Sequence, residues 1–118
     1  MSQSAAQATA FFKEVSESGI VWAIKDENGF PAPLGESGVR AMPFWSSESR
    51  VQQIIKNVSA YKDFTPVELE LTVFKERWLA GLTKDKFNVG VNWSGKCATG
   101  YDLSPADVSK NLEYYENR

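Results

Sequence analysis

The 118-residue sequence predicts a single α+β domain, in which a mixed or mostly antiparallel sheet packs against helices. We expect about five strands and about four helices, because stretches with apolar residues at helical spacing alternate with stretches of extended character. No repeat or Pro/Gly/Ser-rich linker divides the chain, and a chain of this length buries roughly two-thirds of its unfolded surface around one core. Residues 1–118 are therefore expected to form one domain, with its core at about residues 5–115.

The first part of the chain is expected to form a helix followed by extended segments. Apolar residues recur at helical spacing over residues 5–18, and residues 20–25 read as an interior strand covered on both sides. Residues 26–29 form a turn. Residues 30–34 contain two prolines two positions apart, which leaves either an edge strand or an extended loop. Residues 40–45 read as another strand.

A second helix is expected to follow Ser46 and Ser47, either of which can cap it. Its amphipathic stripe is the clearest in the sequence and consists of Val51, Ile54, Ile55 and Val58. Residues 65–71 then look extended, and Thr72 opens a third helix. Glu68 and Glu70 share one side of the extended segment and are interpreted as a solvated strand face.

The last part of the chain predicts a hairpin and a closing helix. Apolar and polar residues alternate over residues 87–93, which indicates a strand with one buried face. Residues 98–103 form the return strand. Ser104 can accept a hydrogen bond from the backbone of Asp107, and Pro105 fits the first helical position, where a missing N–H costs nothing.

The composition argues against most enzyme classes. The sequence contains no histidine, the commonest general base and metal ligand, and neither GxxxxGK[ST] nor GxGxxG occurs. We therefore predict no catalytic residues, no metal site and no cofactor, so an enzyme is disfavoured. The one cysteine, Cys97, has a neighbouring Lys96 that could activate it, but lacks a resolving cysteine or a base and is interpreted as incidental or packed.

Charge and hydropathy restrict the partners. The 13 basic and 15 acidic residues are dispersed and give a net charge of −2, so nucleic acid is not expected as a partner. No stretch approaches the roughly 20 apolar residues of a membrane span, and no signal peptide is visible. With a single cysteine, the chain is expected in the cytoplasm and without a membrane partner.

The strongest candidate binding segment is the start of the second helix. Ser46 and Ser47 present hydroxyls where backbone N–H groups point outward, and Arg50 lies about one turn further on, an arrangement that can hold an anion. Glu48 already supplies a negative charge there, so plain capping explains the same residues.

The four tryptophans can either fill the core or line a ligand cleft. Periodicity assigns Trp22, Trp78 and Trp93 inward faces, whereas the environment of Trp45 is not determined. Trp45, Trp93 and Tyr101 are therefore added to Ser46, Ser47 and Arg50 as candidate binding residues.

Several short motifs together resemble a known family. They are Val21-Trp22-Ala23-Ile24, the Pro-Phe-Trp-Ser-Ser run at residues 43–47, Phe74 with Trp78-Leu79, Gly90-Val91-Asn92-Trp93, Gly100-Tyr101-Asp102-Leu103 and Ser104-Pro105. This series resembles the small bacterial family known as domain of unknown function 2750, from about Ala8 to Leu112. The resemblance implies a stand-alone cytoplasmic domain and no assigned activity. The order of strand, Trp-Ser and amphipathic helix is also distantly similar to SseB-type domains, which would favour protein binding.

Two functions are consistent with the sequence. The first is a noncatalytic protein-binding or adaptor domain that uses an aromatic surface near Trp45 and Trp93 to contact a protein partner or a second copy, as in a homodimer. The alternative is a small-molecule (anion) sensor or enzyme with a pocket at the Trp45-Ser46-Ser47 helix start, assisted by Arg50. Its only plausible acid–base groups are Glu68, Glu70 or Asp102.

Overall fold

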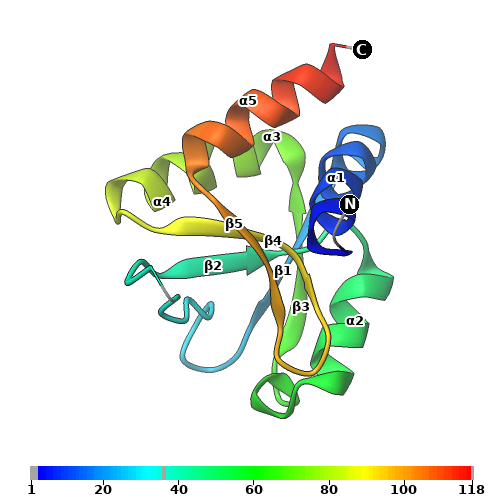
Figure 1. Ribbon diagram of the computed structural model, residues 1–118, viewed down its shortest axis with the longest axis vertical. Coiled ribbons are helices and arrows are strands. Elements are labelled where there is room, and N and C mark those ends of the chain that lie inside the picture. Colours follow the sequence, from blue (N-terminus) through cyan, green and yellow to red (C-terminus); the bar gives the residue numbers. More distant parts are fainter. Residues whose placement is uncertain (1–2, 36, 118) are drawn as a thin grey trace.

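The computed structural model describes residues 3–35 and 37–117 and consists of helices packed around two small sheets (Figure 1). The strands are β1 (Ile20–Lys25), β2 (Ala41–Phe44), β3 (Thr65–Glu70), β4 (Asn88–Ser94) and β5 (Thr99–Leu103). The helices are α1 (Gln3–Ser18), α2 (Glu48–Asn57), α3 (Leu71–Val73), α4 (Leu79–Lys84) and α5 (Pro105–Glu116), with a 3-10 turn η1 (Ser59–Tyr61) and a π turn η2 (Phe74–Trp78). Because α3, η2 and α4 are continuous, the described chain has four helical segments, and the predicted α+β class is confirmed.

The expected sheet is divided into two. β1 pairs antiparallel with β3, while β4 pairs parallel with β2 and antiparallel with β5. The two sheets meet at one bridge, where Trp22 and Trp45 exchange backbone hydrogen bonds of 2.8 Å. The chain turns into α2 directly after Trp45, so only one residue at this end of β2 can pair with β1.

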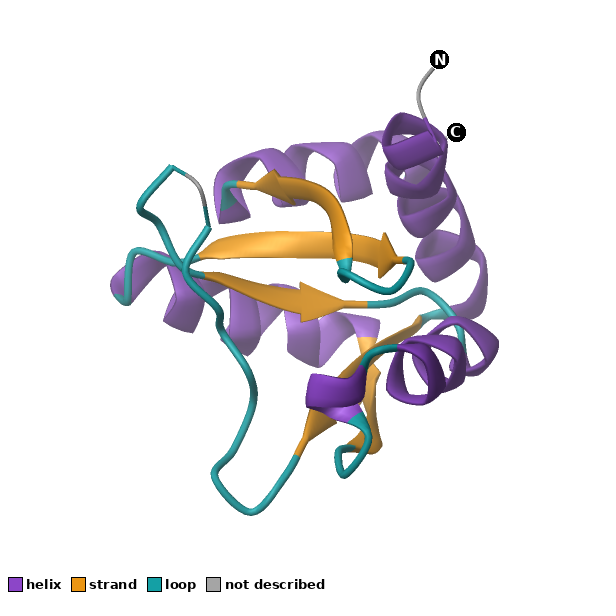
Figure 2. Ribbon diagram, turned by 60° about the horizontal axis from the view of Figure 1, so that its bottom comes forward, coloured by secondary structure: helices purple, strands orange, loops and turns teal. Residues whose placement is uncertain are grey.

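The strand β4 is buried on both faces, which corrects the prediction of one buried face. On one side, α1, α4 and α5 contribute a core that contains Val89, Val91 and Leu112. On the other side, α2 and η1 cover a second cluster that contains Trp45 and Trp93. Figure 2 shows the three-stranded sheet with helices behind it and the loop before β2 in front. The alternation at residues 87–93 predicted the strand correctly. The second face is also buried, but its Gly90 and Asn92 are not the apolar residues that would have indicated burial.

Local signals at the element ends match the sequence. Gly19 ends α1 with φ +73 and donates its N–H to the Val15 carbonyl at 2.8 Å. Ser104 caps α5 by accepting the Asp107 N–H at 3.1 Å. Residues 30–34 form a loop with only an isolated bridge from Leu34 to Arg40, so the loop alternative holds for this proline-containing segment.

Candidate functional site

The start of α2 is capped as the sequence predicts. The Ser47 hydroxyl accepts the Arg50 N–H at 3.2 Å, and Glu48 places a carboxylate in the first turn. Ser46, one residue earlier, points in a different direction and is 4% exposed. The two serines therefore have different roles. Ser47 caps α2, and Ser46 hydrogen-bonds to α1 and β4.

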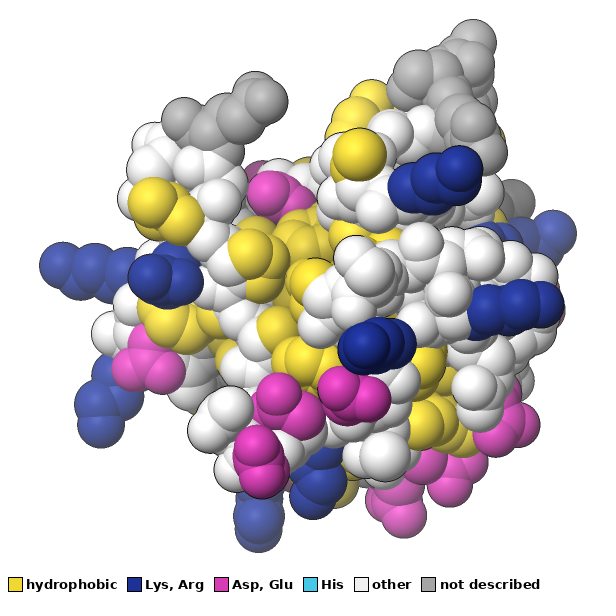
Figure 3. All heavy atoms as spheres, turned by 90° about the horizontal axis from the view of Figure 1, so that it is seen from below, with side chains coloured by type: hydrophobic (Ala, Val, Ile, Leu, Met, Phe, Trp, Pro, Cys, Tyr) yellow, Lys and Arg dark blue, Asp and Glu magenta, His cyan; other side chains and the backbone are white. Residues whose placement is uncertain are grey.

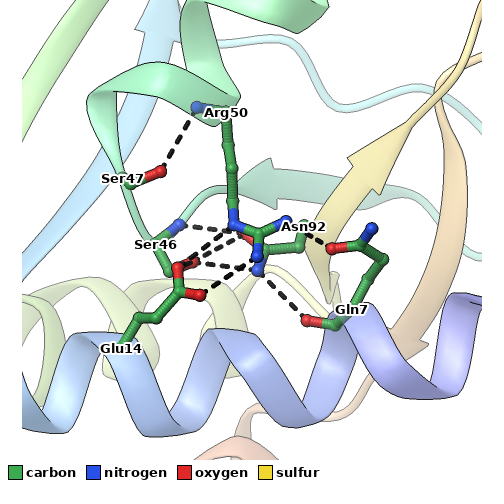
Figure 4. Close-up of polar contacts among 6 residues, drawn as sticks. All are labelled: Gln7, Glu14, Ser46, Ser47, Arg50 and Asn92. Atoms are coloured by element: carbon green, nitrogen blue, oxygen red, sulfur yellow. Dashed lines mark hydrogen bonds and ion pairs between the residues drawn. The ribbon is translucent and has the colours of Figure 1, made fainter.

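An internal carboxylate occupies the position in which an anion was expected (Figure 4). The Ser46 hydroxyl donates to Glu14 Oε1 at 2.6 Å. Arg50 donates from Nε to Glu14 Oε1 at 3.1 Å and from Nη2 to Oε2 at 3.0 Å, a two-point ion pair. The Arg50 hydrogen bonds hold the pKa of Glu14 below its usual value. Partial burial raises this pKa, and the hydrogen bond from Ser46 lowers it further. A free anion at Ser46 would have to displace Glu14.

Asn92 joins the three elements that meet here. Its Oδ1 accepts the Ser46 N–H at 2.9 Å, and its Nδ2 donates to the Ser46 hydroxyl at 2.9 Å and to the Gln7 carbonyl at 3.1 Å. Asn92 is 1% exposed and adopts φ +50 at the bulge in β4, a conformation that asparagine tolerates better than most residues. The Gln7 side chain in turn accepts a hydrogen bond from Arg50.

A small hollow of about 200 Å³ with a mixed polar and apolar lining adjoins this cluster. Its lining includes Arg50, Ser49, Gln53 and Asn57 of α2 together with the end of β4. Its available groups are mainly amides and hydroxyls, because the Arg50 charge is neutralised by Glu14.

The prediction of an aromatic surface at Trp45 is wrong. Trp45 is 0% exposed and donates its indole N–H to the Trp93 carbonyl at 2.8 Å. Trp93 is 7% exposed. Trp45 is buried because it lies where the two sheets meet and α2 covers that junction. Of the six candidate residues, five gather around the α2–β4 junction, whereas Tyr101 lies on β5 and is 43% exposed.

The larger hollow lies on the face of the sheet that carries Trp93, with a volume of about 790 Å³. Its walls come from residues 33–35 and 37, from η1 and from the β4–β5 hairpin, and Figure 3 shows hydrophobic side chains in a recess on this side of the molecule. We call this hollow the hairpin groove. It contains Leu34, whose 63% exposure is the highest among the large hydrophobic residues of the described chain.

The floor of the hairpin groove is built around Trp93. A Cβ at Gly90 would lie 2.4 Å from Trp93 Cε2, and one at Gly100 would lie 2.8 Å from Cδ1, so the indole lies directly on two glycines of neighbouring strands. The indole N–H donates to Asp102 Oδ1 at 2.9 Å. Partial burial raises the pKa of Asp102, and the hydrogen bond from Trp93 opposes this rise.

Sequence reasoning missed Leu34 as a site residue and named Asp102 only as an acid–base group of the alternative function. Leu34 follows a proline-containing segment that indicated only an edge or a loop, and its closeness to the hairpin is set by the tertiary fold. Asp102 carried a weak signal, since it is separated from Gly100 by one residue and shares its strand face. Cys97 is exposed at the rim of the hairpin groove, so of the two interpretations, an incidental or a packed thiol, the packed one is excluded.

Comparison with known proteins identifies a family. A family model described as "Protein of unknown function (DUF2750)" matches residues 8–112. The chain belongs to this family. The likeness to SseB-type domains stays a prediction, and no curated protein matches the chain.

One solved structure, described as Anabaena Tic22 (protein transport), is similar to this DUF2750 domain at 18% identity and a TM-score of 0.41. The match covers 70% of this chain and 44% of the other, so the domain spans less than half of that protein.

Among residues 3–35 and 37–117, no group of three or more His, Cys, Asp or Glu residues is placed to hold a metal ion. In the same ranges, no helix has the length and apolarity to cross a membrane. The expected cytoplasmic location stays a prediction.

Proposed function

We propose that this DUF2750 domain is a noncatalytic protein-binding domain that contacts its partner through the hairpin groove. The observation that carries the proposal is an open hollow of about 790 Å³ with an exposed Leu34 at its wall and a fixed indole at its floor. A rigid aromatic floor loses little conformational entropy when a partner binds, and an exposed apolar side chain beside it gains from burial. Leu34 thus replaces Trp45 as the expected apolar anchor.

The electrostatics of the groove also favour binding over catalysis. Two titratable groups that line the groove are Asp102 and Tyr61, and burial raises the pKa of both. Within residues 3–35 and 37–117, no ion pair or side-chain hydrogen bond joins either group to a second titratable side chain. Acid–base catalysis uses pairs of groups with opposed protonation states.

The test is site-specific photo-crosslinking in cells, with a crosslinking amino acid at Thr99 on the rim of the hairpin groove. We expect a crosslinked product that Leu34→Asp removes and Leu34→Met retains, because methionine conserves volume and apolarity. The matched control places the crosslinker at Tyr114, which is 61% exposed on α5 and outside the groove. A product that is equal at both positions, or that is unaffected by Leu34→Asp, contradicts the proposal.

Binding of a small anion in the 200 Å³ hollow beside Arg50 is the second candidate, favoured by the guanidinium in its lining. A thermal-shift screen against phosphates, nucleotides and carboxylates tests it, since a ligand at 100 times its dissociation constant adds about 2.7 kcal/mol of stability. Because Glu14 competes for Arg50, a true anion ligand should stabilise Glu14→Gln more than the native protein. No stabilisation of either protein refutes this candidate.

A further inference from the structure

The outer strands of this fold differ in how their free sides are protected. A strand at a sheet edge exposes backbone N–H and C=O groups that can pair with another chain, and proteins usually block such edges with proline, charge or a covering segment. β3 carries Pro66 and has exposed glutamates at positions 68 and 70. Proline and charge therefore protect the edge of β3 against pairing with another chain.

The outer sides of β1 and β2 are partly occupied. Trp22 and Trp45 bond to one another across them, and the Ala41 N–H donates to the Pro33 carbonyl at 3.1 Å. β2 also contains Pro43, which has no N–H to offer. Neither strand offers a continuous free edge.

β5 is the exception. It is the last strand in the order β2-β4-β5, and within the described residues no other strand pairs with its outer side. It has no proline and no lysine, the bulge of the hairpin lies between Val91 and Ser94 on β4, and Tyr101 is 43% exposed. Its one charged residue, Asp102, accepts the Trp93 indole N–H. Helix α1 packs against β5, but within the described residues no backbone hydrogen bond uses the outer side of this strand, so its pairing groups are available to a further strand.

The side-chain alternation of β5 places this edge beside the hairpin groove. Gly100 and Asp102 share the face of the groove, while Tyr101 and Leu103 face the opposite side. An added strand would follow the same alternation, so every second side chain would stand next to Asp102 and Trp93. Strand addition and groove binding are therefore compatible with one partner segment.

The charge of Asp102 indicates the chemistry of that segment. Within residues 3–35 and 37–117, the Asp102 side chain accepts one hydrogen bond, from the Trp93 indole, and forms no ion pair. In a two-fold pairing of β5 with a second copy about Tyr101, two Asp102 carboxylates would face each other diagonally on one side of the sheet at roughly 7–8 Å, a repulsive arrangement. A basic side chain from a different protein is complementary to this site instead.

We propose that the outer edge of β5 binds an extended segment of a partner protein as an added strand, with a basic side chain of that segment beside Asp102. This proposal rests on the proposed function, because the same segment would place its neighbouring side chains in the hairpin groove. β5 has five residues and spans about 17 Å, so the pairing segment would be of similar length.

The experiment selects binders from a displayed library of short random peptides against the full-length protein. We expect the enriched peptides to alternate apolar residues with Lys or Arg and to protect the amides of residues 99–103 from hydrogen exchange. Alternate backbone nitrogens of the peptide can be N-methylated in two registers, the odd or the even positions, and only one of these sets faces β5. Methylation in that register should weaken binding about tenfold or more, because it removes the pairing donors and keeps the side chains. Asp102→Asn should weaken the basic peptides about tenfold, while the control Glu68→Gln on β3 should leave them unchanged.

Strand addition would be overturned by the absence of any enriched peptide, by binding that withstands N-methylation in both registers, or by protection of β5 that rises with protein concentration without peptide. The last result would make a second copy the occupant. Peptides that crosslink at the groove but leave the amides of residues 99–103 unprotected would refute strand addition alone. The proposed function fails separately, through the Leu34→Asp crosslinking test.

Discussion

Replacing Gly90 with alanine tests whether the floor of the hairpin groove is built as described. The added Cβ would lie 2.4–2.5 Å from three atoms of the Trp93 indole, closer than carbon atoms can approach, so the ring must move. Gly90 does not have a positive φ, so the substitution adds no backbone strain of that kind. The cost comes from the collision with the ring.

The expected loss of stability has two parts. Overpacking in a well-filled region costs about 1–3 kcal/mol. Displacement of the ring also breaks its 2.9 Å hydrogen bond to Asp102, which adds about 1 kcal/mol. We therefore expect Gly90→Ala to lower the free energy of unfolding by about 2–4 kcal/mol.

The assay is urea denaturation of a double-mutant cycle, followed by circular dichroism. In a Trp93→Leu background the steric conflict is removed, so Gly90→Ala should cost much less than in the native protein. Gly81→Ala is the control, because its Cβ would meet nothing within 4 Å and alanine favours helix by about 0.5–1 kcal/mol. An equal cost of Gly90→Ala in both backgrounds would refute the described packing.

Three other predictions concern the core and the carboxylates. Trp45→Ala should destabilise the protein by about 3–5 kcal/mol in urea denaturation, because a fully buried indole and its bond to Trp93 are lost; a cost below about 1 kcal/mol would contradict burial. The lowered pKa of Glu14 means that its ion pair with Arg50 stabilises the fold above the ordinary carboxyl pKa of 4.5, and that this contribution is lost as pH falls through the folded-state pKa. The urea midpoint of Glu14→Gln should accordingly depend less on pH between neutral and acid than that of the native protein, and equal slopes would argue against the pair. The raised pKa of Asp102 has the opposite sign: its contribution is present below the ordinary pKa of 3.8 and is lost as pH rises through the folded-state value. Asp102→Asn keeps the acceptor for Trp93 and removes the charge, so its urea midpoint at neutral pH should be no lower than the native one; a clear drop would refute this assignment.

Much of the local structure was readable from the sequence because it depends on neighbours along the chain. The caps at Ser47 and Ser104, the end of α1 at Gly19 and the stripe of α2 all depend on contacts within a few residues. The alternation over residues 87–93 also gave a correct strand, although it indicated one covered face instead of two.

The candidate site was less predictable because its partners are distant in sequence. Ser46 and Arg50 were selected as an anion site, but their anion is Glu14, more than thirty residues earlier and on another helix. Nothing in the local pattern of either segment specifies that pairing. Trp45 gave no periodic signal, yet it is fully buried where the two sheets join.

The sequence by itself determined the α+β class, the helix ends, the strands and the likeness to the family, because propensity, capping and periodicity act over short separations. Only the tertiary structure decided that the sheet is divided, that Glu14 fills the anion position, and that Leu34, Trp93 and Asp102 meet at one groove. The physical reason is that burial and ion pairing depend on which distant segments pack together, and each segment alone is compatible with several such packings.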